Sequence, residues 1–227
     1  MTSENVPSFE LCSYFRSTCS ARVRTAANLK NIPLKYSYVS IPKNEHHAPE
    51  YEALNPSRSV PTLLWKESDG ATVVIRQSVA ILEYFEERFP GRQPLLPPAH
   101  NILGRARVRE MVNIIANDVQ PPTNKRILNR VLKLNGNEEE WAREITEAGL
   151  FAFENVARET AGVFSYGDRV TLADIVLAPA VVNAVRFGVD LDRYPTVRRI
   201  YNTIKVMDAF QKGDWQHQGD TPENLRA

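Results

Sequence analysis

The segment SYFRSTCSARVR, residues 13–24, joins an apolar run to a helical pattern through a turn rich in hydroxyl side chains. The apolar residues from Phe9 to Tyr14 predict a short strand. From Cys19 to Lys30 apolar side chains recur at roughly helical spacing, and Asn31-Ile32-Pro33 ends that pattern. The segment therefore predicts a strand that leads directly into the N-terminus of a helix.

The turn Ser17-Thr18-Cys19-Ser20 places hydroxyl and thiol groups at the expected helix N-terminus. The first turn of a helix carries unpaired N–H groups and about half a positive charge, so it stabilises an anion. A hydroxyl donor beside that helix end would lower the pKa of a thiol, which is roughly 8.5 when free. Two other interpretations stay open. The hydroxyl residues could serve as helix caps and nothing more. Cys19 could be either the nucleophile itself or a buried packing residue.

The rest of the first ninety residues repeats this alternation of strand and helix signals. Strands are expected at residues 36–41, 60–65 and 72–75, and helices at residues 49–54 and from residue 78. One face of the last helix is apolar and carries Ile81, Leu82, Phe85 and Phe89. The order β-α-β-α-β-β-α predicts a compact α/β layer.

Beyond this layer the chain changes character. Residues 90–98 are rich in proline and predict a linker. Helical patterns then cover residues 102–134, 138–159, 172–185 and 196–210, and residues 212–227 are expected to form an extended polar tail. Thr171 and Asp174 have the spacing of a capping box, which we interpret as a folding signal. We therefore predict an α/β domain at residues 1–90, a linker at 91–101 and an all-α domain at 102–227.

Two further junctions carry residues suited to an extended anionic ligand. Pro61 opens a strand, and a cis peptide bond there would turn the backbone of Val60 outward to pair with a ligand; an ordinary strand-initiating proline is the alternative. Gln77 and Ser78 stand at a strand-to-helix junction, where they either cap the helix or supply donors for a carboxylate. Each feature is weak alone, and their joint order along the chain is more informative.

The overall composition argues against several other classes of protein. Lys+Arg 28 against Asp+Glu 27 gives a formal net charge of +1, which offers no field for a nucleic acid. Two cysteines and four histidines form neither a disulfide framework nor a recognisable metal site. The first ten residues lack a signal-peptide pattern, and the apolar stretch from Ile175 to Val185 is too short to cross a bilayer. The sequence therefore predicts a soluble cytoplasmic protein with reduced cysteines, no metal, no nucleic acid and no membrane partner.

The joint order of these features resembles a known family. Residues 13–24 closely resemble the SYFRSSCSxRVR signature of zeta-class glutathione transferases, a family that includes the maleylacetoacetate isomerases. The resemblance covers nearly the whole chain and continues at residues 53–56, 60–63, 77–84, 167–168, 170–174, 183–187 and 220–226. It implies the glutathione transferase architecture: a thioredoxin-like N-terminal domain, an all-helical C-terminal domain and a homodimer.

The resemblance also implies roles for individual residues. Ser17 would stabilise the glutathione thiolate, with Thr18 and Cys19 lining the same catalytic pocket. The other implied glutathione contacts are the Val60 backbone beside Pro61, Gln77 and Ser78 at the γ-glutamyl carboxylate, His46 or its rival His47 at the glycyl end, Gln120 and Asn124. Arg186 would hold the carboxylate of an acidic substrate, with Arg16 and Arg22 as further candidates. Two residues depart from the family pattern: Thr18 replaces a serine and adds a methyl group, which would narrow the pocket or slow the enzyme, and Ala21 stands where an aromatic residue is common.

The implied reaction is glutathione-dependent cis–trans isomerisation of maleylacetoacetate to fumarylacetoacetate, in tyrosine and phenylalanine catabolism. Reversible addition of the thiolate would turn a conjugated double bond into a single bond that rotates, while donors or arginines stabilise the enolate. One alternative is a general glutathione transferase or dehalogenase acting on small α-halo acids. The other is a non-catalytic docking module of the same fold. The joint presence of Ser17, Val60-Pro61 and Gln77-Ser78 argues against the docking module.

Overall fold

The computed structural model describes residues 7–227, which divide into two compact units. The first unit holds the described residues up to Gln93 together with Asp208–Ala227, and the second holds Pro94–Met207. The last stretch of the chain therefore belongs to the first unit, whereas the predicted all-α domain at residues 102–227 includes it. The opening residues, in which the sequence lacks a signal-peptide pattern, lie mostly outside the described range.

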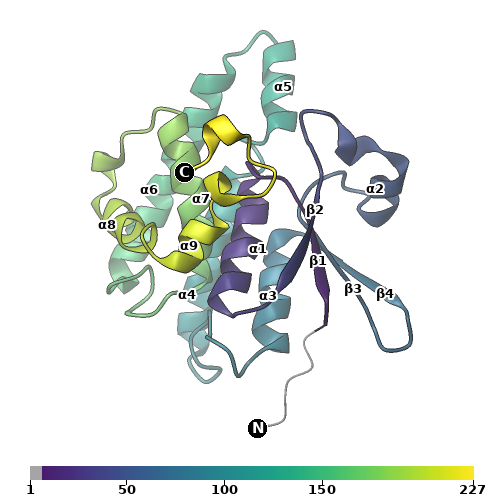
Figure 1. The fold of residues 1–227 in the computed structure, drawn as a ribbon. Helices are drawn as coiled ribbons and strands as arrows, with labels where there is room; N and C mark the ends of the chain where they lie inside the picture. The colour runs from purple at the N-terminus through teal and green to yellow at the C-terminus, as the bar shows by residue number, and fades with distance from the viewer. Residues whose placement is uncertain (1–6) are drawn as a thin grey trace. The chain divides into compact units, whose positions relative to one another are not determined.

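The first unit is built on a four-stranded sheet in the order β2-β1-β3-β4. β1 pairs in parallel with β2 and antiparallel with β3, and β3 pairs antiparallel with β4. The strands are β1 (Phe9–Ser13), β2 (Leu34–Tyr38), β3 (Thr62–Lys66) and β4 (Thr72–Arg76); the helices are α1 (Thr18–Leu29), α2 (Pro49–Leu54) and α3 (Ser78–Arg88). Their order, β-α-β-α-β-β-α, is the predicted one (Figure 1).

Alternation of side chains along β1 gives the sheet two apolar faces. On one face the Phe9 ring lies 5.7 Å from the Phe85 ring and 6.1 Å from the Phe89 ring, between centroids. On the other face Cys12 joins a buried cluster that includes Tyr51 of α2. α1 and α3 therefore cover one face of the sheet and α2 covers the other (Figure 1).

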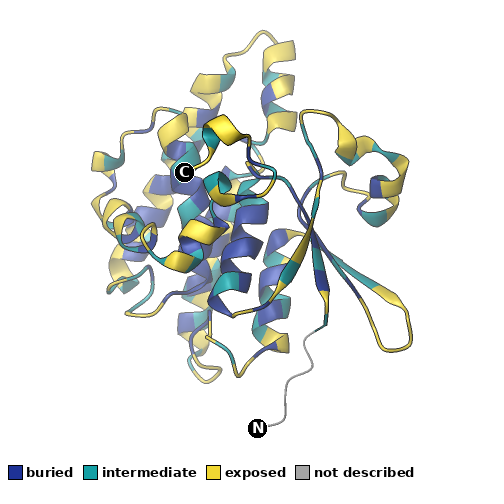
Figure 2. Cartoon of the chain, in the orientation of Figure 1, coloured by how far each residue is buried: buried dark blue, intermediate teal, exposed yellow. Residues whose placement is uncertain are grey.

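The second unit is mostly helical. Its elements are α4 (Ile102–Asn113), the π-helical segment η2 (Ile114–Val119), α5 (Lys125–Lys133), α6 (Glu138–Thr160), α7 (Leu172–Arg186), η3 (Leu191–Arg193) and α8 (Pro195–Ile204). α7 contacts α4, α6 and α8 and is buried along most of its length, whereas α5 is largely exposed (Figure 2). The core of this unit therefore forms around α7.

The N-terminus of α7 contains the predicted capping box. The fully buried Asp174 carboxylate accepts hydrogen bonds from Thr171 N at 2.8 Å and Thr171 Oγ1 at 3.0 Å. Its other oxygen accepts one from Ser165 N at 2.8 Å. The three bonds tie the preceding loop to the central helix, and the predicted capping box of Thr171 and Asp174 is confirmed.

One predicted helix, at residues 102–134, is broken in the structure. Pro121 and Pro122 follow η2 and have no N–H to donate to the preceding turn, so the helix cannot continue through them. Asn124 then caps α5, its Oδ1 accepting from Arg126 N at 2.9 Å. The pattern of apolar residues continues across the break, which is why periodicity alone predicted a single helix.

The predicted helix at residues 196–210 is also split, into α8 and α9 (Asp208–Gly213). Between them Met207 N donates to Ile204 O at 3.0 Å, the spacing of a 3₁₀ turn. The predicted extended tail contains two 3₁₀ turns, η4 (Trp215–His217) and η5 (Glu223–Leu225). β2 ends at Tyr38 rather than at residue 41 because its neighbour β1 ends at Ser13, the residue paired with Tyr38.

No helix among residues 7–227 combines the length and the apolar composition that crossing a membrane requires. Within the same range, no three His, Cys, Asp or Glu side chains are grouped as metal ligands would be.

Candidate active site

Ser17 is the N-cap of α1. Its Oγ accepts from Ser20 N at 3.1 Å, and its own N–H donates to Tyr14 O at 3.0 Å. The first turn of α1 contains no acidic side chain, and Ser17, Thr18 and Cys19 are all partly exposed. The cap uses only a lone pair of the hydroxyl, so the same side chain can cap the helix and donate its proton to an anion. Capping and thiolate stabilisation are therefore compatible at Ser17.

The two cysteines differ in their surroundings, and both are free thiols. Cys12 is 3% exposed in β1, and burial, with a smaller contribution from the charge of Glu10, raises its pKa to about 11. Cys12 is therefore a packing residue. Cys19 is partly exposed in the first turn of α1, beside Ser17.

The Val60-Pro61 peptide bond is cis, as the ligand-pairing interpretation required. The ladders of β3 with both of its neighbours begin at Thr62, so the main chain of Val60 lies beyond their ends. Pairing of Val60 with a ligand would therefore displace no strand bond of the sheet.

Two side chains that were not predicted from the sequence hold the loop that carries Val60. Tyr51 Oη donates to Ser59 O at 2.6 Å, and Asn55 Nδ2 donates to the same oxygen at 2.7 Å. Both also lie 3.0 Å from Thr62 Oγ1. Asn55 is 1% exposed, and its place in the motif at residues 53–56 was the available signal. Tyr51 and Asn55 therefore fix the loop that carries Val60.

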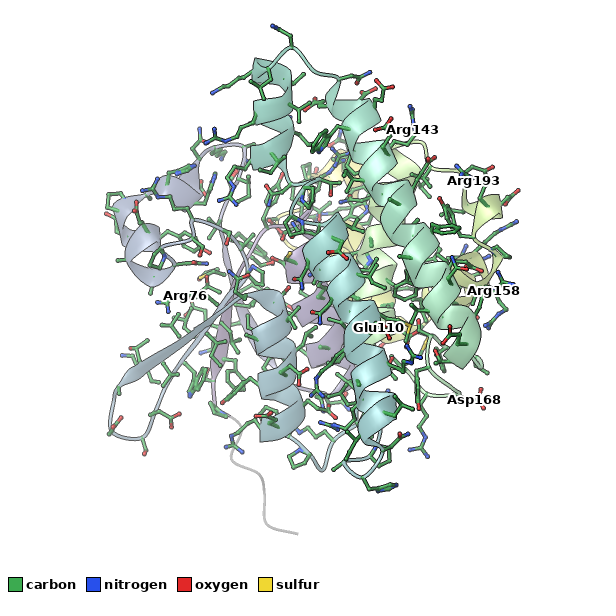
Figure 3. The ribbon with its side chains drawn as sticks, turned by 180° about the vertical axis from the view of Figure 1, so that it is seen from behind. Arg76, Glu110, Arg143, Arg158, Asp168 and Arg193 are labelled. Atoms are coloured by element: carbon green, nitrogen blue, oxygen red, sulfur yellow. The ribbon has the colours of Figure 1, made fainter. Side chains whose placement is uncertain are left out.

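Gln77 and Ser78 form the junction between β4 and α3. Gln77 has a φ of 73°, is exposed and makes no side-chain cap on the helix. Ser78 opens α3 and is 5% exposed. The preceding residue, Arg76, donates from Nε to Leu54 O at 2.6 Å and so ties the end of β4 to α2 (Figure 3).

Arg22 contacts this junction from α1. It belongs to α1, is 2% exposed and donates from Nη1 to Ser78 Oγ at 3.2 Å. Its Nε is buried without a partner, and it forms no ion pair among the described residues. A buried cation without an acid is unfavourable in itself, and here it adds to the positive end of the α3 dipole. From the sequence, Arg22 was a candidate for binding the carboxylate of the substrate; in the structure it donates to Ser78.

The strand register places the three junctions at one end of the sheet. Cys12 of β1 pairs with Thr62 of β3, which pairs with Arg76 of β4. The end of β1, the start of β3 and the end of β4 therefore lie side by side, and they lead to Ser17, Val60 and Gln77 respectively. The arrangement combines a hydroxyl at one helix N-terminus, free backbone groups and a second helix N-terminus, which suits an extended ligand with a thiol and a carboxylate.

The histidine pair lies in η1 (Glu45–His47), in the same unit. Its rings are 4.1 Å apart between centroids. His46 is partly buried, its Nδ1 has no partner among the described residues, and burial followed by the charge of His47 lowers its pKa. His47 is exposed, so His46 is the more enclosed of the two candidates.

The remaining candidates are placed as follows. Gln120 follows η2 in the second unit; its N–H donates to Ile115 O at 3.0 Å, and the extra residue of a π turn shifts its side chain relative to a regular helix. Asn124 uses its Oδ1 as the cap of α5. Arg186 is exposed at the end of α7, and Arg16 of the first unit is exposed over the Trp215 ring, 4.9 Å from its centroid.

The chain is similar to glutathione transferases in both sequence and structure. Residues 16–88 match the model of the glutathione S-transferase N-terminal domain. The chain is 44% identical to maleylacetoacetate isomerase maiA of Aspergillus fumigatus, over 100% of this chain and 98% of that protein. A maleylacetoacetate isomerase structure from Anaeromyxobacter dehalogenans, with GSH bound in its active site, has a TM-score of 0.86 at 40% identity, covering 95% of this chain and 98% of that one. The holo structure of a maleylpyruvate isomerase, a bacterial glutathione S-transferase of the zeta class, has a TM-score of 0.86 at 36% identity, covering 94% of this chain and 100% of that one.

The matches confirm the predicted fold class, a thioredoxin-like α/β part joined to a helical part as in glutathione transferases. They extend over nearly the whole chain, as the resemblance in the sequence did. The chain belongs to the zeta-class glutathione transferases, the family of the maleylacetoacetate isomerases.

Proposed function

We propose that this protein is a glutathione-dependent isomerase that converts maleylacetoacetate to fumarylacetoacetate. The observation that carries the proposal is the position of Ser17 at the open N-terminus of α1, at the same end of the sheet as Val60 and the α3 N-terminus. The identity of 44% with the Aspergillus fumigatus isomerase supports the choice of substrate.

Glutathione would bind as an extended ligand across the end of the sheet. Its γ-glutamyl carboxylate would meet the first turn of α3, where Ser78 and Gln77 supply donors and Arg22 supplies positive charge behind Ser78. The main chain of Val60 would pair with the cysteinyl residue, and His46 would reach the glycyl end. This binding places the glutathione thiol near Ser17, with Thr18 and Cys19 beside it.

The Ser17 hydroxyl and the α1 N-terminus would hold this thiol as a thiolate. The thiolate sulfur adds to one carbon of the cis double bond, and the displaced electron pair moves to the conjugated carbonyl oxygen as an enolate. The former double bond is now single and rotates. The enolate then re-forms the carbonyl and expels the thiolate, which leaves the trans isomer and unchanged glutathione. Donors or arginines close to the enolate oxygen would lower the barrier.

The dicarboxylate substrate calls for cationic groups, and arginine pairs with carboxylates through two parallel hydrogen bonds. Arg16 and Arg186 are the exposed candidates, and Gln120 and Asn124 are proposed as ligand contacts of the second unit. We assign glutathione to the part at residues 1–90 and the second substrate to the part at residues 102–227. We also propose that the protein is a homodimer and that it works in the cytoplasm. Both of these proposals rest on family membership.

The test follows conversion of maleylacetone, a decarboxylated analogue of the substrate, to its trans isomer with and without glutathione. The wild type and the Ser17→Ala variant are compared with Ser20→Ala, which removes a buried hydroxyl of the same turn but keeps the backbone N–H bound to Ser17. We expect glutathione-dependent turnover that Ser17→Ala abolishes and Ser20→Ala preserves. Turnover without glutathione would contradict the mechanism. Chloride release from α-halo acids without isomerisation would favour the dehalogenase, and neither activity would favour the docking module.

A further inference from the structure

The segment Asp208–Asp220, here called the C-terminal segment, packs on α1 within the first unit. Its helix α9 lies beside α1 (Figure 1), and Asn28 Nδ2 donates to Ala209 O at 3.1 Å. At Gly213 the two backbones come so close that a Cβ would lie 2.1 Å from Thr25 Oγ1. The end of the chain is therefore fitted closely to the helix that begins at Ser17.

Arg24 joins this segment to the loop before Ser17. Its side chain is fully buried, and Nε donates to Gly213 O at 2.9 Å. Nη1 donates to Ser13 Oγ at 3.0 Å and Nη2 to Phe15 O at 3.2 Å. Burial lowers the pKa of Arg24 to about 10, so the guanidinium stays charged at neutral pH. One buried cation thus contacts both the C-terminal segment and the loop.

Asp220 holds the same loop from the other side. Its Oδ2 accepts from Phe15 N at 2.9 Å, while its Oδ1 is buried without a partner among the described residues. The N–H and the C=O of Phe15 are therefore both bound, one by Asp220 and one by Arg24. Next to it, Arg16 covers the ring of Trp215, which belongs to η4 in the C-terminal segment.

These contacts determine how the chain enters α1. Phe15 is two residues before Ser17, and Ser17 N donates to Tyr14 O in the same loop. We propose that Asp220 and Arg24 are positioning residues for Ser17, through which the C-terminal segment holds the Ser17 hydroxyl in place for the thiol. The role of the hydroxyl rests on the proposed function; the restraint of the loop does not.

The test compares Asp220→Ala, Asp220→Asn and the control Glu223→Ala in the full chain. Asparagine keeps an acceptor for Phe15 N while it removes the charge and replaces the other carboxylate oxygen by an NH2 group, whereas alanine leaves that N–H without a partner. Glu223 is an exposed residue beside the C-terminal segment, and its carboxylate makes no hydrogen bond or ion pair among the described residues. Hydrogen exchange of residues 14–20 is measured without glutathione. The kcat and the KM for glutathione are then measured, with maleylacetone as the second substrate, well below each variant's unfolding temperature.

We expect Asp220→Ala to exchange faster in residues 14–20 and to lose about tenfold to a hundredfold in kcat/KM for glutathione. Asp220→Asn should stay within about threefold of the wild type, and Glu223→Ala should match it. If the alanine variant does not fold, Asp220→Glu, which moves the carboxylate by one methylene, takes its place. We then expect the same faster exchange in residues 14–20 and the same loss of kcat/KM for glutathione. Unchanged exchange, or an Asp220→Ala variant that is less stable yet equally active, would overturn the proposal. Because exchange needs no ligand, an inactive wild type would count against the proposed function alone.

Discussion

Replacing Arg22 by methionine would test whether the buried cation behind α3 contributes to anion binding. Arg22 is 2% exposed, and its Nη1 donates to Ser78 Oγ at 3.2 Å. A hydrogen bond to a charged group contributes about 1.5–3 kcal/mol. If that free energy supports the orientation of Ser78 toward the γ-glutamyl carboxylate, Arg22→Met weakens glutathione binding by about tenfold to a hundredfold.

The same substitution should leave the folded protein at least as stable. Arg22 has no acidic partner among the described residues, and its Nε is buried without a hydrogen bond. Replacing even a buried ion pair by apolar side chains of similar volume is often neutral or stabilising, and Arg22 carries the desolvation cost of a buried charge without the attraction of a partner. We therefore expect opposite signs: weaker binding of glutathione and an unchanged or higher unfolding temperature.

Titration calorimetry with two ligands would show whether Arg22 contributes to binding of the γ-glutamyl carboxylate. One ligand is glutathione, and the other is an analogue that lacks the γ-glutamyl α-carboxylate. Arg22→Met should weaken binding of the first far more than binding of the second. The control is Arg58→Met, which removes an exposed arginine of the same unit that pairs with Glu52. Equal losses for both ligands, or a loss of binding that follows a fall in the unfolding temperature, would show that Arg22 does not act on the γ-glutamyl carboxylate.

Three further predictions concern stability, pH and thiol chemistry. Asp174→Ala removes a carboxylate that accepts three buried hydrogen bonds, so the free energy of unfolding in urea should fall by at least about 2 kcal/mol, and an unchanged value would contradict its capping role. Burial lowers the pKa of His46, so the unfolded chain binds a proton there more readily, and stability should be lost as pH falls through its usual value of about 6.5; His46→Gln should flatten this part of the stability–pH curve. A thiol reagent at neutral pH should label Cys19 in the native protein and spare Cys12, whose pKa is raised to about 11; mass spectrometry showing equal labelling would contradict the burial of Cys12.

Much of the fold could be predicted from the sequence because local signals and tertiary packing agree. The alternation along β1, the apolar face of α3 and the capping box at Thr171 all lie within a few residues of the structure that they specify. The breaks in the two long helical patterns were missed because apolar periodicity continues across them. Pro121 and Pro122 carried a signal of a break that the periodicity outweighed.

Site residues could be predicted from the sequence where their place in a turn between a strand and a helix determines their role. Ser17 and Ser78 stand at strand-to-helix junctions, and the sequence shows both junctions directly. Arg22 and Arg24 were not predictable in this way, because arginine is usually exposed and the burial of these two depends on distant partners. For Arg24 that partner is Gly213, which is 189 residues away along the chain. Such contacts require the folded structure.

The proposed function depends most on the Ser17 hydroxyl, which would stabilise the thiolate of bound glutathione. The direct measurement is the ultraviolet absorbance of the thiolate, titrated against pH at saturating glutathione, for the wild type, Ser17→Ala and Ser17→Thr. We expect a thiol pKa well below its free value of roughly 8.5 on the wild type, a return toward that value in Ser17→Ala, and rescue by Ser17→Thr, which keeps both hydroxyl and cap. The same thiol pKa in the wild type and in Ser17→Ala would show that the Ser17 hydroxyl does not stabilise the thiolate.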